Sequence, residues 1–380
     1  MVQCSLPLAL GMVLMLMPML LVCEFRPLGG VQALSTDMAA LLAFKSAVLP
    51  QGNPDDPLPN WVGTDSSPCS WTGVTCNSDN EVVRLQLSDI ELSGTMPAQL
   101  FTILALEHLD LSLNALSGSI PLDIGNLTRL NYLNLTANQM LSGPIPLSLF
   151  GLFNLQSLDL SYNSISGVLS SDIELLVNLQ ELVLGSNSFS GVIPPEIGTL
   201  SMLQYLDLSS NTFSGTLPVQ LGNLVNLQHL DLSSNALSGD IPALETMSNL
   251  EFVDVSSNFF SGVISPQVAT LASLTYLDFS NNSLSGPIPS QIWGMTSLQE
   301  LDLGANALTG SLPRELGNLI NLQSFYLGDS HLTGMLKPVC GSIYASSPYT
   351  SKVTAAPTHQ GQLKTEQSSE DSFAVGISCL

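Results

Sequence analysis

Residues 203–218 read LQYLDLSSNTFSGTLP, and closely related stretches begin at ten other positions of this 380-residue chain. Aligned on their first apolar residue, the eleven units start at residues 82, 106, 130, 155, 179, 203, 227, 250, 274, 298 and 322. The step from one unit to the next is 24 residues, except for 25 in the third unit and 23 in the seventh. This period predicts an array of stacked supersecondary units that bury their apolar faces against one another.

The letters of the repeat have separate structural roles. In residues 205–208 (YLDL), Leu206 and Leu208 are expected to point inward and the residues between them outward. One short strand cannot bury its leucines alone, so stacked copies should form a parallel sheet over a continuous core. The Gly permits a tight turn, and the Pro ends local pairing.

An asparagine follows each strand and is expected to turn inward, where its amide satisfies backbone groups as the chain leaves the strand. The column consists of Asn114, Asn138, Asn163, Asn187, Asn211, Asn235, Asn258, Asn282 and Asn306. The first and last units carry Ile90 and Ser330 at this position, as is typical of irregular end units.

Residues 1–33 are interpreted as a secretory signal peptide. The apolar run 6–22 is short for a membrane span, and Val31 and Ala33 supply the small residues required for cleavage near Ala33. The alternative is an uncleaved N-terminal anchor. Secretion implies an oxidising compartment, in which we expect Cys69 and Cys76 to form a disulfide. The remaining pair, Cys340 and Cys379, is expected either to bond across the tail or to stay free.

The chain is strongly acidic, with 31 Asp and Glu against 8 Lys and Arg and a net charge of −23. This balance argues against nucleic acid and anionic membrane surfaces as partners and favours basic or neutral ones. The alternative is that the charge only keeps a leucine-rich array soluble.

Three motifs together resemble the plant-type extracellular leucine-rich repeat family. They are LSGxIP within the 24-residue period, TDMAALLAFKSAV at 36–48, and LPNWVGTDSSPCSWTGVTC at 58–76. The resemblance implies an α/β solenoid: a right-handed leucine-rich repeat superhelix with a concave parallel β-sheet and a helical, disulfide-bonded N-terminal cap. The predicted organisation is a signal peptide at 1–33, a cap at 34–81, eleven repeats at 82–338 and a flexible Ser/Thr/Pro-rich tail at 339–380.

The sequence departs from that family beyond Pro338. The closely spaced C-terminal cysteine pair of the family is absent, and no kinase signature follows the repeats. The paired Arg-x-Arg that captures a peptide carboxylate in the family is also absent. We therefore expect no enzyme activity, no cofactor and no metal site, since a straight column of single carboxylates does not wrap an ion.

Two outward-facing columns form the candidate ligand-binding site. Aromatic residues stand beside aspartates in four successive units, and the site residues are Tyr205, Asp207, His229, Asp231, Phe252, Asp254, Tyr276 and Asp278. Exposed rings supply rigid apolar area for a partner, although they are also able simply to stack on one another. Sequons for glycosylation occur at Asn126, Asn134 and Asn281.

The leading functional hypothesis is an extracellular recognition module, a receptor-like ectodomain in cell-surface signalling or defence that binds a peptide or protein and has no catalytic domain. A co-receptor ectodomain is a further expected partner, and membrane association would require a partner or an absent downstream segment. The alternatives are a secreted inhibitor of cell-wall-degrading enzymes, similar to polygalacturonase inhibitors, and a truncated, non-signalling receptor fragment. The expected location is secreted or at the cell surface.

Overall fold

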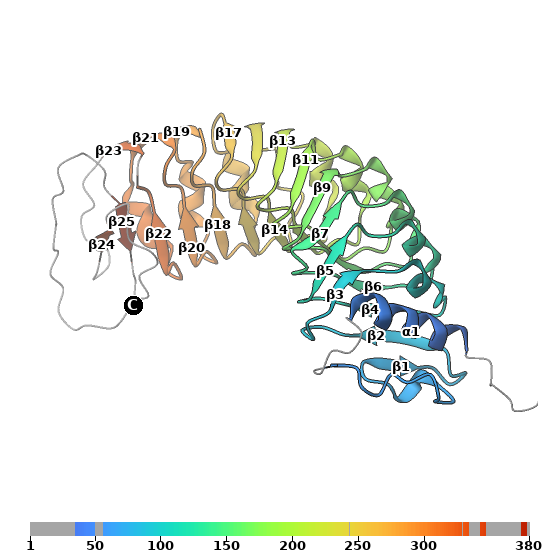
Figure 1. The fold of residues 1–380 in the computed structure, drawn as a ribbon. Helices are drawn as coiled ribbons and strands as arrows, with labels where there is room; N and C mark the ends of the chain where they lie inside the picture. The colour runs from blue at the N-terminus through green and yellow to red at the C-terminus, as the bar shows by residue number, and fades with distance from the viewer. Residues whose placement is uncertain are drawn as a thin grey trace, which may run out of the picture.

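The computed structural model describes residues 35–49, 56–242, 244–328 and 330–333, together with strands β24 (Ile343–Ser346) and β25 (Ala374–Ile377). The chain forms one curved solenoid, with a helical cap at its N-terminal end (Figure 1). The predicted signal segment 1–33 and the cysteines Cys340 and Cys379 lie outside the described residues.

Helix α1 (Thr36–Val48) covers the N-terminal end of the core. Ser35 caps the helix by accepting a hydrogen bond from the backbone N–H of Met38. The apolar face of the helix is buried, including Leu41 and Phe44. Lys45 near its end pairs with Asp56 at 2.7 Å.

The cap continues through the 3₁₀ turn η1 (Pro68–Ser70), which is tied to strand β1 (Val74–Cys76) by the disulfide between Cys69 and Cys76. Beneath it, the rings of Trp61 and Trp71 stack with centroids 5.4 Å apart. β1 pairs antiparallel with the first repeat strand, so the cap extends the sheet instead of ending it. The helical, disulfide-bonded cap is therefore confirmed.

One twelve-stranded sheet lines the concave side of the solenoid, and every pair in it after β1–β2 is parallel and in register. After β1 its strands are β2 (Val82–Gln86), β4 (His108–Asp110), β6 (Tyr132–Asn134), β8 (Ser157–Asp159), β10 (Glu181–Val183), β12 (Tyr205–Asp207), β14 (His229–Asp231), β16 (Phe252–Asp254), β18 (Tyr276–Asp278), β20 (Glu300–Asp302) and β22 (Ser324–Tyr326). The strands are short because each repeat turns the chain after about three residues. The predicted concave sheet is confirmed.

A second row of strands runs along one side of the solenoid, and the sequence analysis missed it. It comprises β3 (Ser93–Thr95), β5 (Ala115–Gly118), β7 (Met140–Gly143), β9 (Ser164–Val168), β11 (Ser188–Gly191), β13 (Thr212–Thr216), β15 (Ala236–Asp240), β17 (Phe259–Ser261), β19 (Ser285–Pro287), β21 (Ala307–Ser311) and β23 (His331–Thr333). The LSG letters that predicted only a turn build these strands. Gly215, within β13, has a φ of 79°, which a side chain would strain.

Short 3₁₀ helices form the convex side. They are η2 (Ala98–Thr102), η3 (Leu122–Asn126), η4 (Leu147–Gly151), η5 (Ser171–Leu175), η6 (Pro195–Thr199), η7 (Val219–Asn223), η8 (Pro266–Thr270), η9 (Ser290–Gly294) and η10 (Arg314–Asn318). Within the described residues no such helix lies between η7 and η8, which is where the unit of 23 residues falls. The lost residue thus removes a convex turn and leaves the concave strands in register.

The inward asparagines form the predicted ladder. Asn211 donates to the carbonyls of Leu184, Leu208 and Ser209 at 3.0, 3.2 and 2.9 Å. Its Oδ1 accepts from the backbone N–H of Phe189 at 2.9 Å. One side chain thereby joins two successive units, and the prediction for this column is confirmed.

A second ladder on the convex side was not predicted. The side chains of Asn154, Asn178, Asn226, Asn249 and Asn321 each donate to a carbonyl of the preceding unit at 2.7–3.0 Å. Each of these residues is the last of its unit and directly precedes the first leucine of the next unit. At this position the sequence shows only that Asn is frequent.

At the C-terminal end, β24 and β25 pair antiparallel, and β25 lies against β22. The tail boundary at residue 339 and the flexibility expected of the tail remain predictions, because most of that segment lies outside the described residues.

Candidate ligand-binding surface

Four rings on the concave sheet form a continuous stack, here called the ring column: Tyr205, His229, Phe252 and Tyr276. Successive centroids are 4.0, 4.1 and 4.2 Å apart, and the interplanar angles are 5–10°. In-register pairing from β12 to β18 places the four side chains in one line. The structure therefore brings the predicted aromatic residues together, and they also stack as the alternative interpretation expected.

Stacking decides which part of each ring a ligand meets. The two inner rings, His229 and Phe252, have a neighbour on both faces, so their faces are covered and their edges point into the concave space. A ring edge is apolar and slightly positive, whereas the face is negative. The ring column thus offers apolar contact to a ligand, and cation–π contact is restricted to its two ends.

A second line lies two residues further along each strand. This carboxylate column comprises Asp207, Asp231, Asp254, Asp278 and Asp302. In each, Oδ1 accepts a hydrogen bond from the backbone N–H two residues on, at 2.8–2.9 Å. For Asp207 and Asp231 the serine hydroxyl at that position donates to the same oxygen, at 2.6 and 2.7 Å.

The second oxygen of these carboxylates is less engaged. Oδ2 of Asp278 lies 3.5 Å from the Tyr276 hydroxyl, and the side chains of Ser256 and Ser280 also hydrogen-bond to the carboxylates of Asp254 and Asp278. At Asp207 and Asp231 the bonds from the backbone N–H and from the serine hydroxyl all go to Oδ1, so Oδ2 is left for a ligand.

Burial governs the protonation of both columns. It raises the pKa of Asp231 to about 6 and that of Asp302 to about 7, and neighbouring carboxylates add to both effects. It lowers the pKa of His229 to about 4, so this ring is neutral at physiological pH. The negative charge of the surface thus increases between about pH 5 and pH 8.

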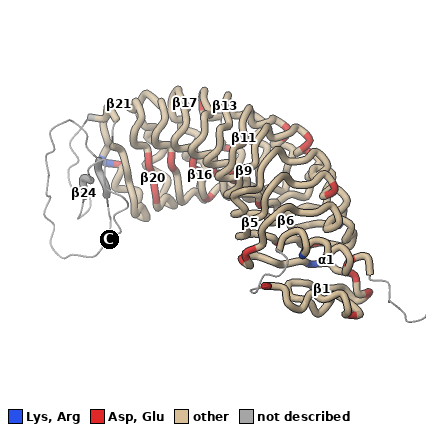
Figure 2. Tube along the Cα trace, viewed as in Figure 1, with Lys and Arg blue, Asp and Glu red and all other residues tan. Residues whose placement is uncertain are grey.

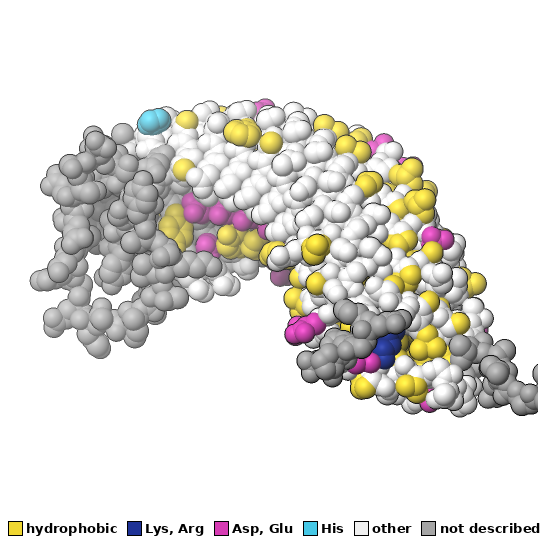
Figure 3. All heavy atoms as spheres, in the orientation of Figure 1, with side chains coloured by type: hydrophobic (Ala, Val, Ile, Leu, Met, Phe, Trp, Pro, Cys, Tyr) yellow, Lys and Arg dark blue, Asp and Glu magenta, His cyan; other side chains and the backbone are white. Residues whose placement is uncertain are grey.

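Negative charge gathers on the concave side toward the C-terminal half (Figure 2). No Lys or Arg occupies an outward position of strands β4 to β22; Arg84 on β2 is the nearest basic residue of the sheet. In the space-filling view, the acidic side chains form a row next to apolar ones in the hollow of the arc (Figure 3).

The columns end at defined strands. On β10 the two positions hold Glu181 and Val183, and Glu181 accepts from the Ser157 hydroxyl at 2.8 Å. On β22 they hold Ser324 and Tyr326. Nearer the N-terminus, His108 and Tyr132 stack with centroids 4.1 Å apart, a second aromatic pair that the site prediction omitted. In the sequence, His108 and Tyr132 occupy the same outward repeat position as the four rings of the ring column.

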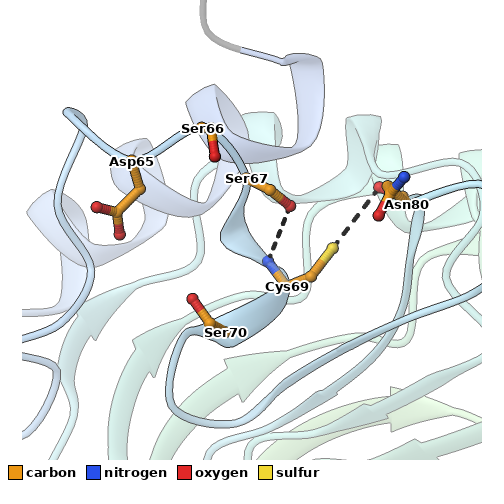
Figure 4. Close-up of a pocket in the computed structure, with 6 residues that line it drawn as sticks. All are labelled: Asp65, Ser66, Ser67, Cys69, Ser70 and Asn80. Carbon is orange, nitrogen blue, oxygen red and sulfur yellow. Dashed lines mark hydrogen bonds between the residues drawn. The ribbon is translucent and has the colours of Figure 1, made fainter.

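A hollow lies in the cap, away from the ring column (Figure 4). It measures about 510 Å³ and is lined by Asp65, Ser66, Ser67, Cys69, Ser70 and Asn80. Ser67 accepts from the Cys69 backbone N–H at 3.2 Å, and the Cys69 sulfur, bonded to Cys76, makes a van der Waals contact with the Asn80 carbonyl. These groups are occupied in building the cap turn, and the wall has little apolar area for a ligand.

The described residues contain no group of three or more His, Cys, Asp or Glu arranged to hold a metal ion. None of their helices is long and apolar enough to span a bilayer.

The three sequons occupy different surfaces. Asn126 is exposed at the end of η3, and Asn281 is exposed with a φ of 53°, beyond the end of β18. Asn134 lies on the concave sheet at the carboxylate-column position of β6, where its Oδ1 accepts from the Thr136 N–H at 2.9 Å. Asn126 lies on η3, Asn281 follows Asp278 by three residues, and Asn134 lies three strands before the ring column.

Comparison with known families gives three matches along the chain. The leucine-rich repeat N-terminal domain matches residues 34–77. Leucine-rich repeat models match residues 177–237 and 248–308, and a shorter one matches 105–127 and 154–176. A probable inactive leucine-rich repeat receptor-like protein kinase of Arabidopsis thaliana is 43% identical over 75 residues, which is 20% of this chain and 11% of that protein.

Solved structures show the same architecture. The leucine-rich repeat ectodomain of the receptor kinase GASSHO1/SCHENGEN3 from Arabidopsis thaliana, in complex with CASPARIAN STRIP INTEGRITY FACTOR 2, superposes with a TM-score of 0.77 at 37% identity, covering 80% of this chain and 37% of that one. The Arabidopsis receptor kinase HAESA ectodomain, in complex with an N-terminally extended IDA peptide hormone ligand, gives a TM-score of 0.58 at 30% identity, with 79% of this chain and 58% of that one covered. A plant ice-binding protein gives 0.62 at 32%, with 73% and 88% covered. The chain thus spans well under two thirds of both receptors.

Proposed function

The chain belongs to the plant extracellular leucine-rich repeat proteins, as a receptor-like ectodomain, and on that premise we propose that it binds a peptide or protein ligand on its concave sheet at the ring column. The observation that carries the proposal is the stack from Tyr205 to Tyr276, a half-buried line of four rings on the concave sheet. Rigid aromatic area of this kind binds partners at low entropic cost.

The similar structures support the class of ligand. Two of the superposed ectodomains are named as complexes, one with CASPARIAN STRIP INTEGRITY FACTOR 2 and the other with a peptide hormone. This chain is proposed to act in the same class, outside the cell or at its surface, with a co-receptor ectodomain as a further partner. The relative that is named a receptor-like protein kinase aligns with this chain over only 11% of its length. Signalling is proposed to depend on a partner or on a segment other than the repeats.

Glycans at Asn126, Asn134 and Asn281 are part of the proposal. A glycan on Asn134 would stand on the concave sheet at β6, and β8 and β10 separate it from β12, where the ring column begins. At about 4.8 Å per strand this is a separation of about 14 Å, so a glycan on Asn134 leaves the ring column open. A glycan on Asn281 would stand three residues beyond the end of β18, at the C-terminal end of the ring column.

The test is a binding screen of the secreted, glycosylated protein against extracellular peptides, receptor ectodomains and fungal cell-wall hydrolases, the last of which tests the inhibitor alternative. Any ligand found is then measured by calorimetry against Phe252→Ala/Tyr276→Ala. The matched control is Phe259→Ala/Tyr162→Ala, which removes the same two side-chain types from positions that are 63% and 64% exposed and off the concave sheet. We expect the concave pair to weaken binding at least tenfold and the control pair to leave it unchanged. Equal affinities for both variants would refute the placement.

A second candidate function rests on the row of lateral strands. Its outermost column is small and almost uncharged: Thr95, Ser119, Pro144, Val168, Val192, Thr216, Asp240, Val263, Pro287 and Ser311. A column with one residue from each successive unit forms a repetitive surface, and a plant ice-binding protein shares the architecture over 88% of its length. Thermal hysteresis and ice-crystal shaping, measured for the parent and for Val192→Lys, would test ice binding; a parent that neither depresses freezing nor shapes crystals rules it out.

A further inference from the structure

The carboxylate column carries more charge than the scaffold requires. Each aspartate ends its strand by accepting an N–H bond through Oδ1, yet at the same position of β6 the neutral Asn134 makes this bond at 2.9 Å. Burial raises the pKa of Asp231, Asp254, Asp278 and Asp302, and neighbouring carboxylates contribute to each rise, so the charged form is disfavoured. A neutral amide keeps the backbone bond without that penalty, although at Asp207 and Asp231 the carboxylate also accepts from a serine hydroxyl. The column therefore carries more negative charge than its bond to the backbone requires.

Resting on the ligand-binding function proposed above, we infer that the ligand of this surface is an extended peptide with alternating basic and apolar side chains. Its basic groups pair with the carboxylates of the carboxylate column, and its apolar side chains lie on the edges of the ring column. The partner is chosen by charge complementarity: among the described residues, no outward Lys or Arg from β4 to β22 neutralises the column.

The separation of the two columns matches a single extended chain. They lie two residues apart on every strand, for instance at Phe252 and Asp254, which is about 7 Å. A peptide running across the strands between them directs successive side chains to opposite sides, one toward the carboxylates and the next toward the rings. A simple alternation in the ligand sequence therefore satisfies both columns at once.

The length of the column sets the length of the ligand. Five carboxylates on successive strands span four strand spacings, or about 19 Å, and an extended chain advances about 3.3 Å per residue. About six residues cover the column. Three strand spacings measure about 14 Å, and four residues of an extended peptide measure about 13 Å. Basic side chains four residues apart in the peptide therefore lie opposite carboxylates three strands apart, so every second basic side chain meets a carboxylate.

Stacking of the rings decides which side chains of the peptide lie against the ring column and which lie against the carboxylate column. The faces of the inner rings are covered at 4.0–4.2 Å, and the exposed edges carry the positive end of the ring quadrupole. A cation gains nothing there, while an apolar group gains contact area. The basic side chains are thus directed to the carboxylates, and the apolar ones to the rings.

Lower pH should weaken the complex. The groups that face Asp231 are Asp207, Asp254 and the Ser233 hydroxyl. Those facing Asp302 are Asp278, Asp254, Glu300, the Gly304 N–H and, on the neighbouring strand β22, Tyr326. None of these groups is basic, and His229 is neutral because burial lowers its pKa to about 4. Protonation of the column between pH 7.5 and pH 5 then removes negative charge with no compensating change on the sheet.

The experiment measures binding of a labelled, amidated seven-residue peptide with Lys at positions 1, 3, 5 and 7 and Leu between them. Matched peptides carry Gln or Glu in place of Lys. We expect the Lys peptide to bind at least tenfold more tightly than the Gln peptide, the Glu peptide not to bind, and the affinity for Lys to fall about fivefold from pH 7.5 to pH 5.

The protein variant is Asp207→Asn/Asp231→Asn/Asp254→Asn, whose amides keep the strand-ending bond as Asn134 does. Its control, Asp123→Asn/Asp172→Asn/Asp240→Asn, removes the same charge from η3, η5 and β15. We expect the first to lose about tenfold in affinity for the Lys peptide and the second to lose less than twofold. Equal losses would reduce the effect to net charge and overturn the inference.

The outcomes separate this inference from the proposed function. If the screen yields an uncharged or acidic ligand whose binding is lost in Phe252→Ala/Tyr276→Ala, the concave site stands and the alternating basic ligand is refuted. If every ligand binds that double variant as tightly as the parent, the concave site itself is refuted.

Discussion

Replacing Asn211 by Leu should destabilise the solenoid through one backbone group. The side chain donates to three carbonyls, but each of them has a second donor: Asn187 for Leu184, Asn235 for Leu208, and the backbone N–H of Ser186 for Ser209. The Phe189 N–H, in contrast, loses the Oδ1 that it contacts at 2.9 Å.

The magnitude follows from this count. One buried donor without an acceptor costs about 1–3 kcal/mol, and weaker bonding at three carbonyls adds a smaller amount. A loss of about 2–3 kcal/mol lowers the melting temperature of a domain of this size class by about 4–12 °C. The position tolerates no compensating movement, because Asn211 is 8% exposed and lies between two units of the core.

The assay is thermal unfolding followed by circular dichroism, with Asn226→Leu as the matched control. Asn226 belongs to the exposed convex ladder and makes one side-chain bond, to the Ser201 carbonyl at 2.8 Å. We expect a fall of at most about 2 °C in the control. A change of about 1–2 °C in melting temperature corresponds to about 0.5 kcal/mol. If the melting temperature of Asn211→Leu lies within about 1–2 °C of the parent, this account of the ladder is refuted.

Substitution of Asn211 by Asp separates the two halves of its role. Aspartate keeps an acceptor for the Phe189 N–H but turns a carboxylate toward three carbonyl oxygens. We expect Asn211→Asp to be destabilised at pH 7 and partly recovered at pH 4, because protonation removes the charge and restores one donor. A destabilisation independent of pH would mean that the carbonyl contacts contribute little.

Three further predictions concern the cap, the last unit and the carboxylates. Cys69→Ser/Cys76→Ser should lose about 2.5 kcal/mol, since the bond closes a loop with a sequence separation of 7, and non-reducing peptide mapping should find the two residues joined in the parent. Amide hydrogens of residues 322–333 should exchange faster than those of 227–240, because η10 has no buried residue; equal protection would show that β25 stays docked on β22. Asp302→Asn should raise the melting temperature at pH 8 and have little effect at pH 4, where the parent carboxyl is already protonated; an equal gain at both pH values would contradict the raised pKa.

Much of this architecture was predictable because each repeat places the same residue types at the same positions and so makes the same contacts with its neighbours. Leu206 and Asn211 sit in a period of 24, and neither their burial nor their partners depend on distant sequence. The backbone at Ser210, which has a φ of 50°, could not be predicted, since nothing about a serine before an asparagine requires a left-handed conformation. The lateral strands were missed for a related reason: their LSG letters read as a turn, and pairing arises only when stacked units place those turns side by side.

The candidate site was predictable in position but not in geometry. Alternation placed Phe252 and Asp254 on the concave face, and the strand register then aligned them with their neighbours. The sequence did not reveal that the rings stack at 4.0–4.2 Å with their faces covered, nor that one oxygen of each aspartate is already bonded. Both facts depend on side-chain orientation, and both decide which ligand chemistry the surface accepts.

The carboxylate column gives stability and affinity opposite dependences on pH. The pKa of Asp231, about 6 in the folded protein, lies above its ordinary value of 3.8, so the folded state binds more protons between those values. Its contribution to stability is therefore fully present below about pH 4 and is lost as the pH rises through 6. Attraction for a cationic peptide changes in the other direction, because it requires the ionised carboxylate. A complex that weakens at pH 5 while the free protein becomes more stable cannot owe its loss to unfolding, and the two measurements together identify the column as the cause.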